Sequence, residues 1–189
     1  MQWRNTSSRY GVFSLFLHWG QRAGGLRPVR PGPVDARAEL LRPWYHPAPA
    51  LHKSIGILLA IALLVRIVWR FVSPPPPAPA NHGPATRVAS KLGHLALYAL
   101  LVAVIVAGYL ISTADGEPIS VFGWFSVPAT LSGLPDQADV AGEIHLYLAW
   151  ALVVFAVLHA FAALKHHFVD RDPTLKRMLG RSSNEQQPR

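Results

Sequence analysis

Three long apolar runs constrain the fold of this chain more than any other feature. They cover residues 51–72, 92–112 and 144–164, and each is close to the ~20 residues that a helix needs to cross a bilayer. The chain is 51% hydrophobic, yet its formal net charge is +8. Apolar spans with basic cytoplasmic ends combine these two properties, so the sequence predicts an all-α integral membrane protein. The runs leave no room for a soluble basic domain, which argues against nucleic-acid binding.

The charges between the runs predict the topology. The segment 66–91 and the C-terminal tail are basic, whereas the loop 113–143 has no Lys or Arg and carries Asp115, Glu117, Asp136, Asp139 and Glu143. By the positive-inside rule, the proline-rich linker SPPPPAPANHGPA and the C-terminus face the cytoplasm. The N-terminus faces the same side if a further span precedes residue 51. The stretch VFGWFSVP in the acidic loop is a candidate for the membrane interface.

That further span begins but is not completed. Residues 12–19 read VFSLFLHW, and then residues 20–43 become rich in Arg, Gly and Pro, a composition that cannot cross a bilayer. We therefore expect a four-helix bundle whose first helix, about 11–42, is disrupted after Trp19. One hypothesis is a shifted reading frame: a permitted back-translation from Gly20, read one base later, gives ASGLVAFALFALGLWMRELSYYD. The alternative is a genuine basic loop, and resequencing of the gene decides between them.

The histidines are the main chemical signal. There are nine, and a polar imidazole inside an apolar span is costly and usually functional. His145 and His159 are close to four helical turns apart, so their rings share one helix face roughly 21 Å apart along the axis. Two haems stacked across a bilayer need one such site near each surface. The topology pairs His52 with His145 on the outer side and His18 with His159 on the inner side, with His94 as a rival for the inner site.

Other interpretations of these histidines are weaker. His46 and His82 lie beside prolines in loops and are interpreted as ordinary interfacial residues, while His166 and His167 are balanced between that interpretation and a functional one. The chain has no cysteine, which excludes iron–sulfur clusters, thiolate-bound haem and covalent CxxCH attachment. No Cys, Asp or Glu lies beside the histidines inside the spans, so zinc is disfavoured there. A proton-relay chain stays open.

Four stretches resemble the bacterial cytochrome b561 family, the diheme four-helix membrane cytochromes related to the cytochrome b subunits of nickel hydrogenases. They are RYGVFSLFLHW, LHKSIGILLAIALLVRIVWRF followed by PPPP, KLGHLALYALLVAVIVAGY, and IHLYLAWALVVFAVLHAFAALKHHFVDRDPTLKRML. The resemblance defines a domain over residues 10–179, followed by a polar tail over 180–189. It departs from the family at 20–43, where the family has the rest of the first helix.

The resemblance implies two b-type haems and a set of site residues. Its haem-ligand positions fall on His18, His52, His145 and His159, and a frequent family histidine of open role falls on His94. Lys165, His166 and His167 are the candidates for a contact on the quinone side. Lys53, beside His52, is a candidate to attract superoxide or a haem propionate, or else a lysine that extends to the lipid headgroups.

The resemblance also implies a function in the bacterial inner membrane. Family members pass electrons between a periplasmic one-electron donor, superoxide among the candidates, and the membrane quinone pool. Whether the chain is a superoxide:quinone oxidoreductase or only an electron carrier stays open. The alternatives are a membrane-anchor subunit of a larger dehydrogenase or hydrogenase, and a small histidine-based transporter. Lipid, quinone and the donor are the expected partners, and both a homo-oligomer and a partner subunit are open. No hydrolase motif is visible.

Overall fold

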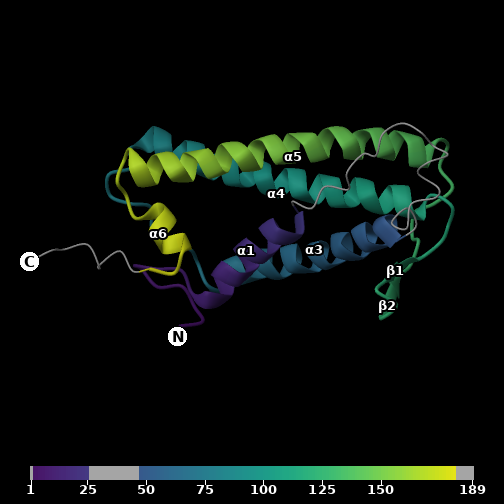
Figure 1. Ribbon diagram of the computed structural model, residues 1–189, viewed down its shortest axis with the longest axis horizontal. Helices are drawn as coiled ribbons and strands as arrows, with labels where there is room; N and C mark the ends of the chain where they lie inside the picture. The colour runs from purple at the N-terminus through teal and green to yellow at the C-terminus, as the bar shows by residue number, and fades with distance from the viewer. Residues whose placement is uncertain (1, 26–46, 182–189) are drawn as a thin grey trace, which may run out of the picture.

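The computed structural model describes residues 2–25 and 47–181, and this part of the chain is a bundle of long helices (Figure 1). The helices are α1 (Val12–Gly25), α3 (Pro47–Val72), α4 (Pro84–Thr113), α5 (Gln137–Phe168) and the short α6 (Thr174–Met178). Within the described residues, α3, α4 and α5 are long and apolar enough to cross a membrane. The predicted fold class, a helical membrane bundle, is therefore confirmed.

The bundle consists of two helix pairs. α1 packs on α3, and α4 packs along the length of α5, as Figure 1 shows. Successive long helices run in opposite directions. The N-terminal segment, the linker 73–83 and α6 therefore gather at one end, and the loop 114–136 closes the other.

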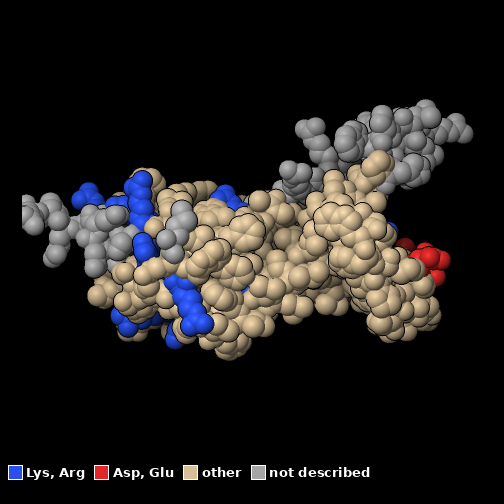
Figure 2. Space-filling view, turned by 90° about the horizontal axis from the view of Figure 1, so that it is seen from below, with Lys and Arg blue, Asp and Glu red and all other residues tan. Residues whose placement is uncertain are grey.

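Charge separates along the same axis. In Figure 2 the Lys and Arg side chains gather toward one end of the molecule, and the visible Asp and Glu side chains lie at the other. This is the asymmetry from which the topology was predicted. Between the two ends the surface is apolar, with Leu64 64% and Phe161 63% exposed. Such side chains suit contact with lipid tails rather than water.

Helix α1 continues past Trp19 to Gly25. Gln, Arg and Ala are good helix formers, which is consistent with a further turn after the apolar start. At 1.5 Å per residue its 14 residues are roughly 21 Å long, less than the ~30 Å of a hydrocarbon core. The rest of the predicted first span lies outside the described residues, as does His46. The reading-frame hypothesis therefore stays a prediction.

A small hairpin closes the acidic end against α3. Its strands β1 (Ile119–Val121) and β2 (Phe125–Val127) are antiparallel, with Ile119 opposite Val127. The hydroxyl of Ser54 on α3 accepts a hydrogen bond from the backbone N–H of Phe122 at 3.1 Å. Val121 is fully buried, whereas Trp124 is 75% exposed. The hairpin thus turns one face to α3 and presents an aromatic ring outward, as an interfacial segment would.

Candidate functional site: two groups of histidines inside the bundle

His52 on α3 and His145 on α5 lie together near the acidic end, with ring centroids 6.0 Å apart. The Nδ1 atom of His145 is 2.9 Å from the carbonyl oxygen of Val104 on α4. Since a carbonyl only accepts hydrogen bonds, Nδ1 must carry the proton, and Nε2 keeps a free lone pair. A carbonyl on the second ring nitrogen is the usual way in which proteins orient a ligating histidine.

Glycine at position 108 makes room for this ring. A Cβ built on Gly108 would lie 3.1 Å from Cε1 and 3.2 Å from Nδ1 of His145. Glycine is unfavourable inside a helix, by roughly 0.5–1 kcal/mol relative to alanine. Its presence one turn after Val104 is explained by the close approach of the ring. Val104 and Gly108 together form the seat on α4 that fixes His145.

Three histidines gather toward the basic end. The ring centroid of His159 on α5 lies 6.3 Å from that of His18 on α1 and 5.3 Å from that of His94 on α4. The Nδ1 atom of His94 lies 2.7 Å from the backbone carbonyl of Ser90, which again leaves Nε2 free. The structure thus brings the predicted inner pair, His18 and His159, together, and His94 lies beside His159 as the alternative partner.

Arg66 of α3 lies next to this inner group, and sequence reasoning missed it. Its Nη1 donates to Oε1 of Gln21 at 2.7 Å, and its Nη2 lies 3.0 Å from Nδ1 of His18. Its guanidinium also lies over the ring of Tyr98, 5.5 Å from the centroid. In the sequence, Arg66 contributes only to the basic charge of the segment 66–91. The missed signal is its spacing: Arg66 follows His52 by the same fourteen residues that separate His145 and His159, so it shares a helix face with His52.

The geometry of the two predicted pairs fits a metal ion held between facing imidazoles. With metal–nitrogen bonds of about 2.0 Å on opposite sides of one ion, ring centroids stand about 6.3 Å apart. The pairs His52–His145 and His18–His159 have 6.0 Å and 6.3 Å. His145 already has the proton arrangement of a ligand. His18 would need Arg66 to turn away, because ligation through Nε2 puts a proton on Nδ1, and a guanidinium only donates.

Comparisons with known proteins show the family of the chain. Residues 9–181 match the family model described as prokaryotic cytochrome b561. The chain belongs to the prokaryotic cytochrome b561 family. It is 54% identical over 192 residues to cytochrome b561 homolog 2 of Escherichia coli K12, with 98% of each chain covered. It is 32% identical over 138 residues to a probable superoxide oxidase CybB of Yersinia pestis, with 73% of this chain and 76% of the relative covered.

Membership of the cytochrome b561 family means a membrane protein of electron transfer that binds b-type haem. Haem iron takes its axial ligands from side chains, and in a cysteine-free chain imidazole is the suitable donor. The outer and inner histidine groups bring imidazoles together between the helices of the described bundle. His18, His145 and His159 are half-buried there, whereas His52 and His94 are exposed.

The other predicted site residues have varied surroundings. Lys53 is exposed beside His52 at the acidic end. Lys165 forms an ion pair with Asp170 at 2.8 Å, and Nδ1 of His166 also lies 2.8 Å from that carboxylate. Nδ1 of His167 is buried and has no hydrogen-bond partner among the described residues. A quinone contact at these three residues stays a prediction, and two of them already have acidic partners.

The interpretation of His82 as an ordinary interfacial residue was wrong. Only 9% of the residue is exposed, and its Nε2 lies 2.6 Å from Oδ2 of Asp172. The two residues are 90 positions apart, so no local pattern could have linked them. The physical reason is the reversal of the chain after α5, which brings Asp172 back against the linker that precedes α4.

Proposed function

We propose that this cytochrome holds two b-type haems, one between His52 and His145 and one between His18 and His159. The single observation that carries the proposal is the pair of centroid separations, 6.0 Å and 6.3 Å, at opposite ends of one helix. Both α5 histidines share a helix face roughly 21 Å apart along the axis. Two such sites allow an electron to enter from one membrane face and leave toward the other.

We further propose that the electron moves from a periplasmic one-electron donor to the quinone pool of the bacterial inner membrane. The basic end, with both termini, faces the cytoplasm in this proposal, and the acidic loop faces the periplasm. The name of the Yersinia pestis relative supports superoxide as the donor. The exposed Lys53 beside His52 suits an anionic donor. Two superoxide ions would be oxidised to two molecules of O₂ for each quinone that takes two electrons and two protons.

The haem supplies the one-electron chemistry when it is bound, and the chain supplies position and charge. The carbonyl of Val104 holds the tautomer and orientation of His145. Arg66 supplies a permanent positive charge near the inner histidines. A nearby positive charge favours the electron-rich state of a redox centre, so Arg66 would make the inner site the better electron acceptor. An inner site of higher potential suits electron flow from the outer site to the inner one.

The test is a reduced-minus-oxidised visible spectrum of the purified protein, with haem counted per chain. Two b-type haems per chain are expected, and a redox titration should resolve two midpoint potentials. One haem per chain would contradict the second site. Well-folded protein without haem would contradict both sites. The donor is tested separately by supplying superoxide to the haem-loaded protein and following quinol formation. If no quinol forms although two haems are bound, superoxide is rejected as the donor, and the proposal of two haems stands.

A further inference from the structure

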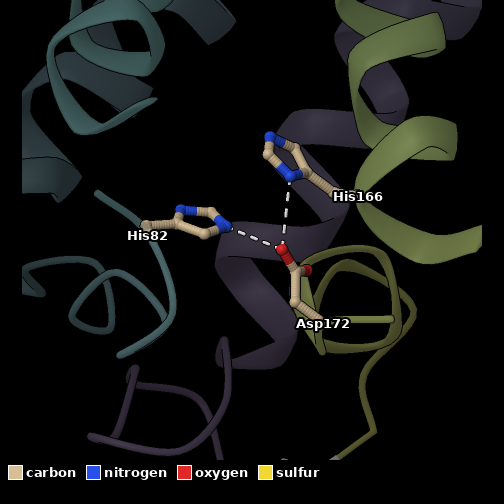
Figure 3. A group of neighbouring side chains, drawn as sticks. All are labelled: His82, His166 and Asp172. Atoms are coloured by element: carbon tan, nitrogen blue, oxygen red, sulfur yellow. Dashed lines mark hydrogen bonds and ion pairs between the residues drawn. The ribbon is translucent and has the colours of Figure 1, made fainter. Parts of the chain in front are cut away.

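A third cluster of potential metal ligands lies at the basic end, outside the predicted spans. His82 comes from the linker between α3 and α4, His166 from the last turn of α5, and Asp172 from the turn that precedes α6 (Figure 3). Nε2 of His82 lies 2.6 Å from Oδ2 of Asp172, and Nδ1 of His166 lies 3.3 Å from the same oxygen. In Figure 3 both rings point a nitrogen at this one carboxylate oxygen.

The cluster is separate from the inner histidine group. His166 follows His159 by seven residues on α5, which is roughly 10 Å along the axis. The His82 and His166 rings contact each other, with centroids 4.7 Å apart. Among the described residues, neither ring contacts the ring of His18, His94 or His159. A ligand at this cluster is therefore independent of the two proposed haems.

The three side chains are withdrawn from solvent. The exposed fractions of the side chains are 8% for His82, 1% for Asp172 and 13% for His166. The second carboxylate oxygen of Asp172 accepts the backbone N–H of Thr174 at 2.8 Å, which turns Oδ2 toward the imidazoles. Burial raises the pKa of Asp172, but hydrogen bonds from Thr174 and His82 outweigh it, and the net pKa lies below its usual value. The carboxylate is thus ionised at neutral pH.

The backbone of the turn is shaped to bring this carboxylate back to α5. The N–H of Asp172 donates to the carbonyl of His166 at 3.0 Å. Arg171 adopts a left-handed conformation with φ of 51°, which is unfavourable for a non-glycine residue. The neighbouring Asp170 contacts the same nitrogen, with its Oδ2 2.8 Å from Nδ1 of His166. Two carboxylates thus converge on one imidazole nitrogen at the end of α5.

We propose that His82, His166 and Asp172 form a site for a divalent transition-metal ion of the zinc class. The donor atoms, Nε2, Nδ1 and Oδ2, all lie within 4.8 Å of one another. Tetrahedral zinc with bonds of about 2.0–2.1 Å has ligand atoms about 3.3 Å apart, so shifts below about 1 Å would complete the site. Two imidazoles and one carboxylate favour zinc over calcium or magnesium, which prefer all-oxygen ligands. Water or Asp170 would provide the fourth ligand.

Zinc here would tie the α3–α4 linker to the C-terminal segment. In the metal-free protein the hydrogen bond between His82 and Asp172 and the 3.3 Å contact of His166 with the same carboxylate hold these segments together. The surroundings are basic, but Lys165 already pairs with Asp170. Zinc binding would replace a hydrogen-bonded contact by metal–ligand bonds and stabilise the folded end against opening.

The test is zinc binding to the haem-loaded, detergent-solubilised protein after chelator treatment, measured by equilibrium dialysis and elemental analysis. The purification tag must contain no histidine. We expect one zinc per chain in addition to haem iron, and a rise in the unfolding temperature when zinc is added. His82→Gln and Asp172→Asn should each weaken zinc binding at least about tenfold, since even changes outside the ligand shell cost metal sites 10–100-fold.

His167→Gln is the matched control, because it removes the adjacent histidine of the same helix end and leaves the three donors intact. It should bind zinc as the unsubstituted protein does. Haem per chain, measured on every variant, shows that the bundle has folded. The proposal is overturned if the unsubstituted protein binds no more zinc than His82→Gln, or if His167→Gln weakens binding equally. In either case the cluster is a hydrogen-bonded contact only.

Discussion

Nη2 of Arg66 lies 3.0 Å from Nδ1 of His18, on the neighbouring helix of the same pair. A charged side chain at this depth is expensive unless its donors are satisfied. Here Gln21 accepts a second hydrogen bond from the guanidinium, and the Tyr98 ring lies beneath it. The contact joins α1 to α3 inside the bundle. It also puts a permanent positive charge next to a proposed haem ligand.

Replacing Arg66 by Gln should lower the midpoint potential of the inner haem by tens of millivolts. At an effective dielectric constant of about 20, a unit charge roughly 8 Å from a redox centre contributes about 2 kcal/mol. For one electron, about 59 mV corresponds to a tenfold change in the equilibrium constant. A spectroelectrochemical titration measures the shift. Arg66→Lys should retain most of the potential, and Arg70→Gln, an exposed position one turn further along α3, should change it less. An unaltered potential in Arg66→Gln would contradict the assigned role.

Replacing Gly108 by Ala should loosen the outer haem. The added Cβ would lie 3.1 Å from Cε1 of His145, so the ring must move away from its carbonyl partner. We expect less haem retained per chain, together with a shifted potential of the remaining outer haem. Gly93→Ala on the same helix is the matched control, because a Cβ there meets nothing within 4 Å. Both changes increase helix propensity equally. Equal haem content and potentials in the two variants would contradict the role of Gly108 in positioning His145.

Single histidine substitutions should separate the two haem sites. His52→Ala and His145→Ala are each expected to lose one haem per chain and retain the inner spectrum. His159→Ala should lose the inner haem. Between the two candidate partners of His159, His18 has the centroid separation that fits an intervening ion, so His18→Ala should lose the inner haem and His94→Ala should not. The opposite result for these two variants would assign the inner ligand to His94.

Replacing Asn5 by Ala should destabilise the basic end of the bundle. Its side chain joins the N-terminal segment to the end of α3 through hydrogen bonds with Ser73, Pro74, Gly11 and Ser14. Leaving part-buried partners unsatisfied costs about 1–3 kcal/mol. Thermal unfolding of the haem-loaded protein, followed by haem absorbance, measures the loss. Gln2→Ala changes an exposed side chain nearby and should leave the unfolding temperature within error. A similar fall of the unfolding temperature in both variants would show that any change in the N-terminal segment destabilises the protein, and not the loss of the Asn5 hydrogen bonds.

Much of the fold follows from properties that run along the chain. Residues 51–72, 92–112 and 144–164 predicted helices, because an apolar run of about 20 residues has the length of a membrane-spanning helix, which satisfies its own backbone in lipid. In the structure each helix begins several residues before its predicted run. The fourteen-residue step between His145 and His159 placed them on one face of α5. The ring pairs were predicted from topology and depth. The described helices bring the ring centroids of these pairs to 6.0 Å and 6.3 Å, which leaves room for one metal ion between the two rings of each pair.

What the sequence by itself determined is what depends on hydropathy and helical period: the spans, their alternating direction, the charge asymmetry and the depth of the histidines. Tertiary structure decided which side chains meet. The contact of Arg66 with His18 joins two different helices, and that of His82 with Asp172 joins two segments 90 positions apart. Such contacts depend on how helices rotate and cross and on how a turn folds back. These are set by packing of the whole chain, and no local pattern in the sequence encodes them.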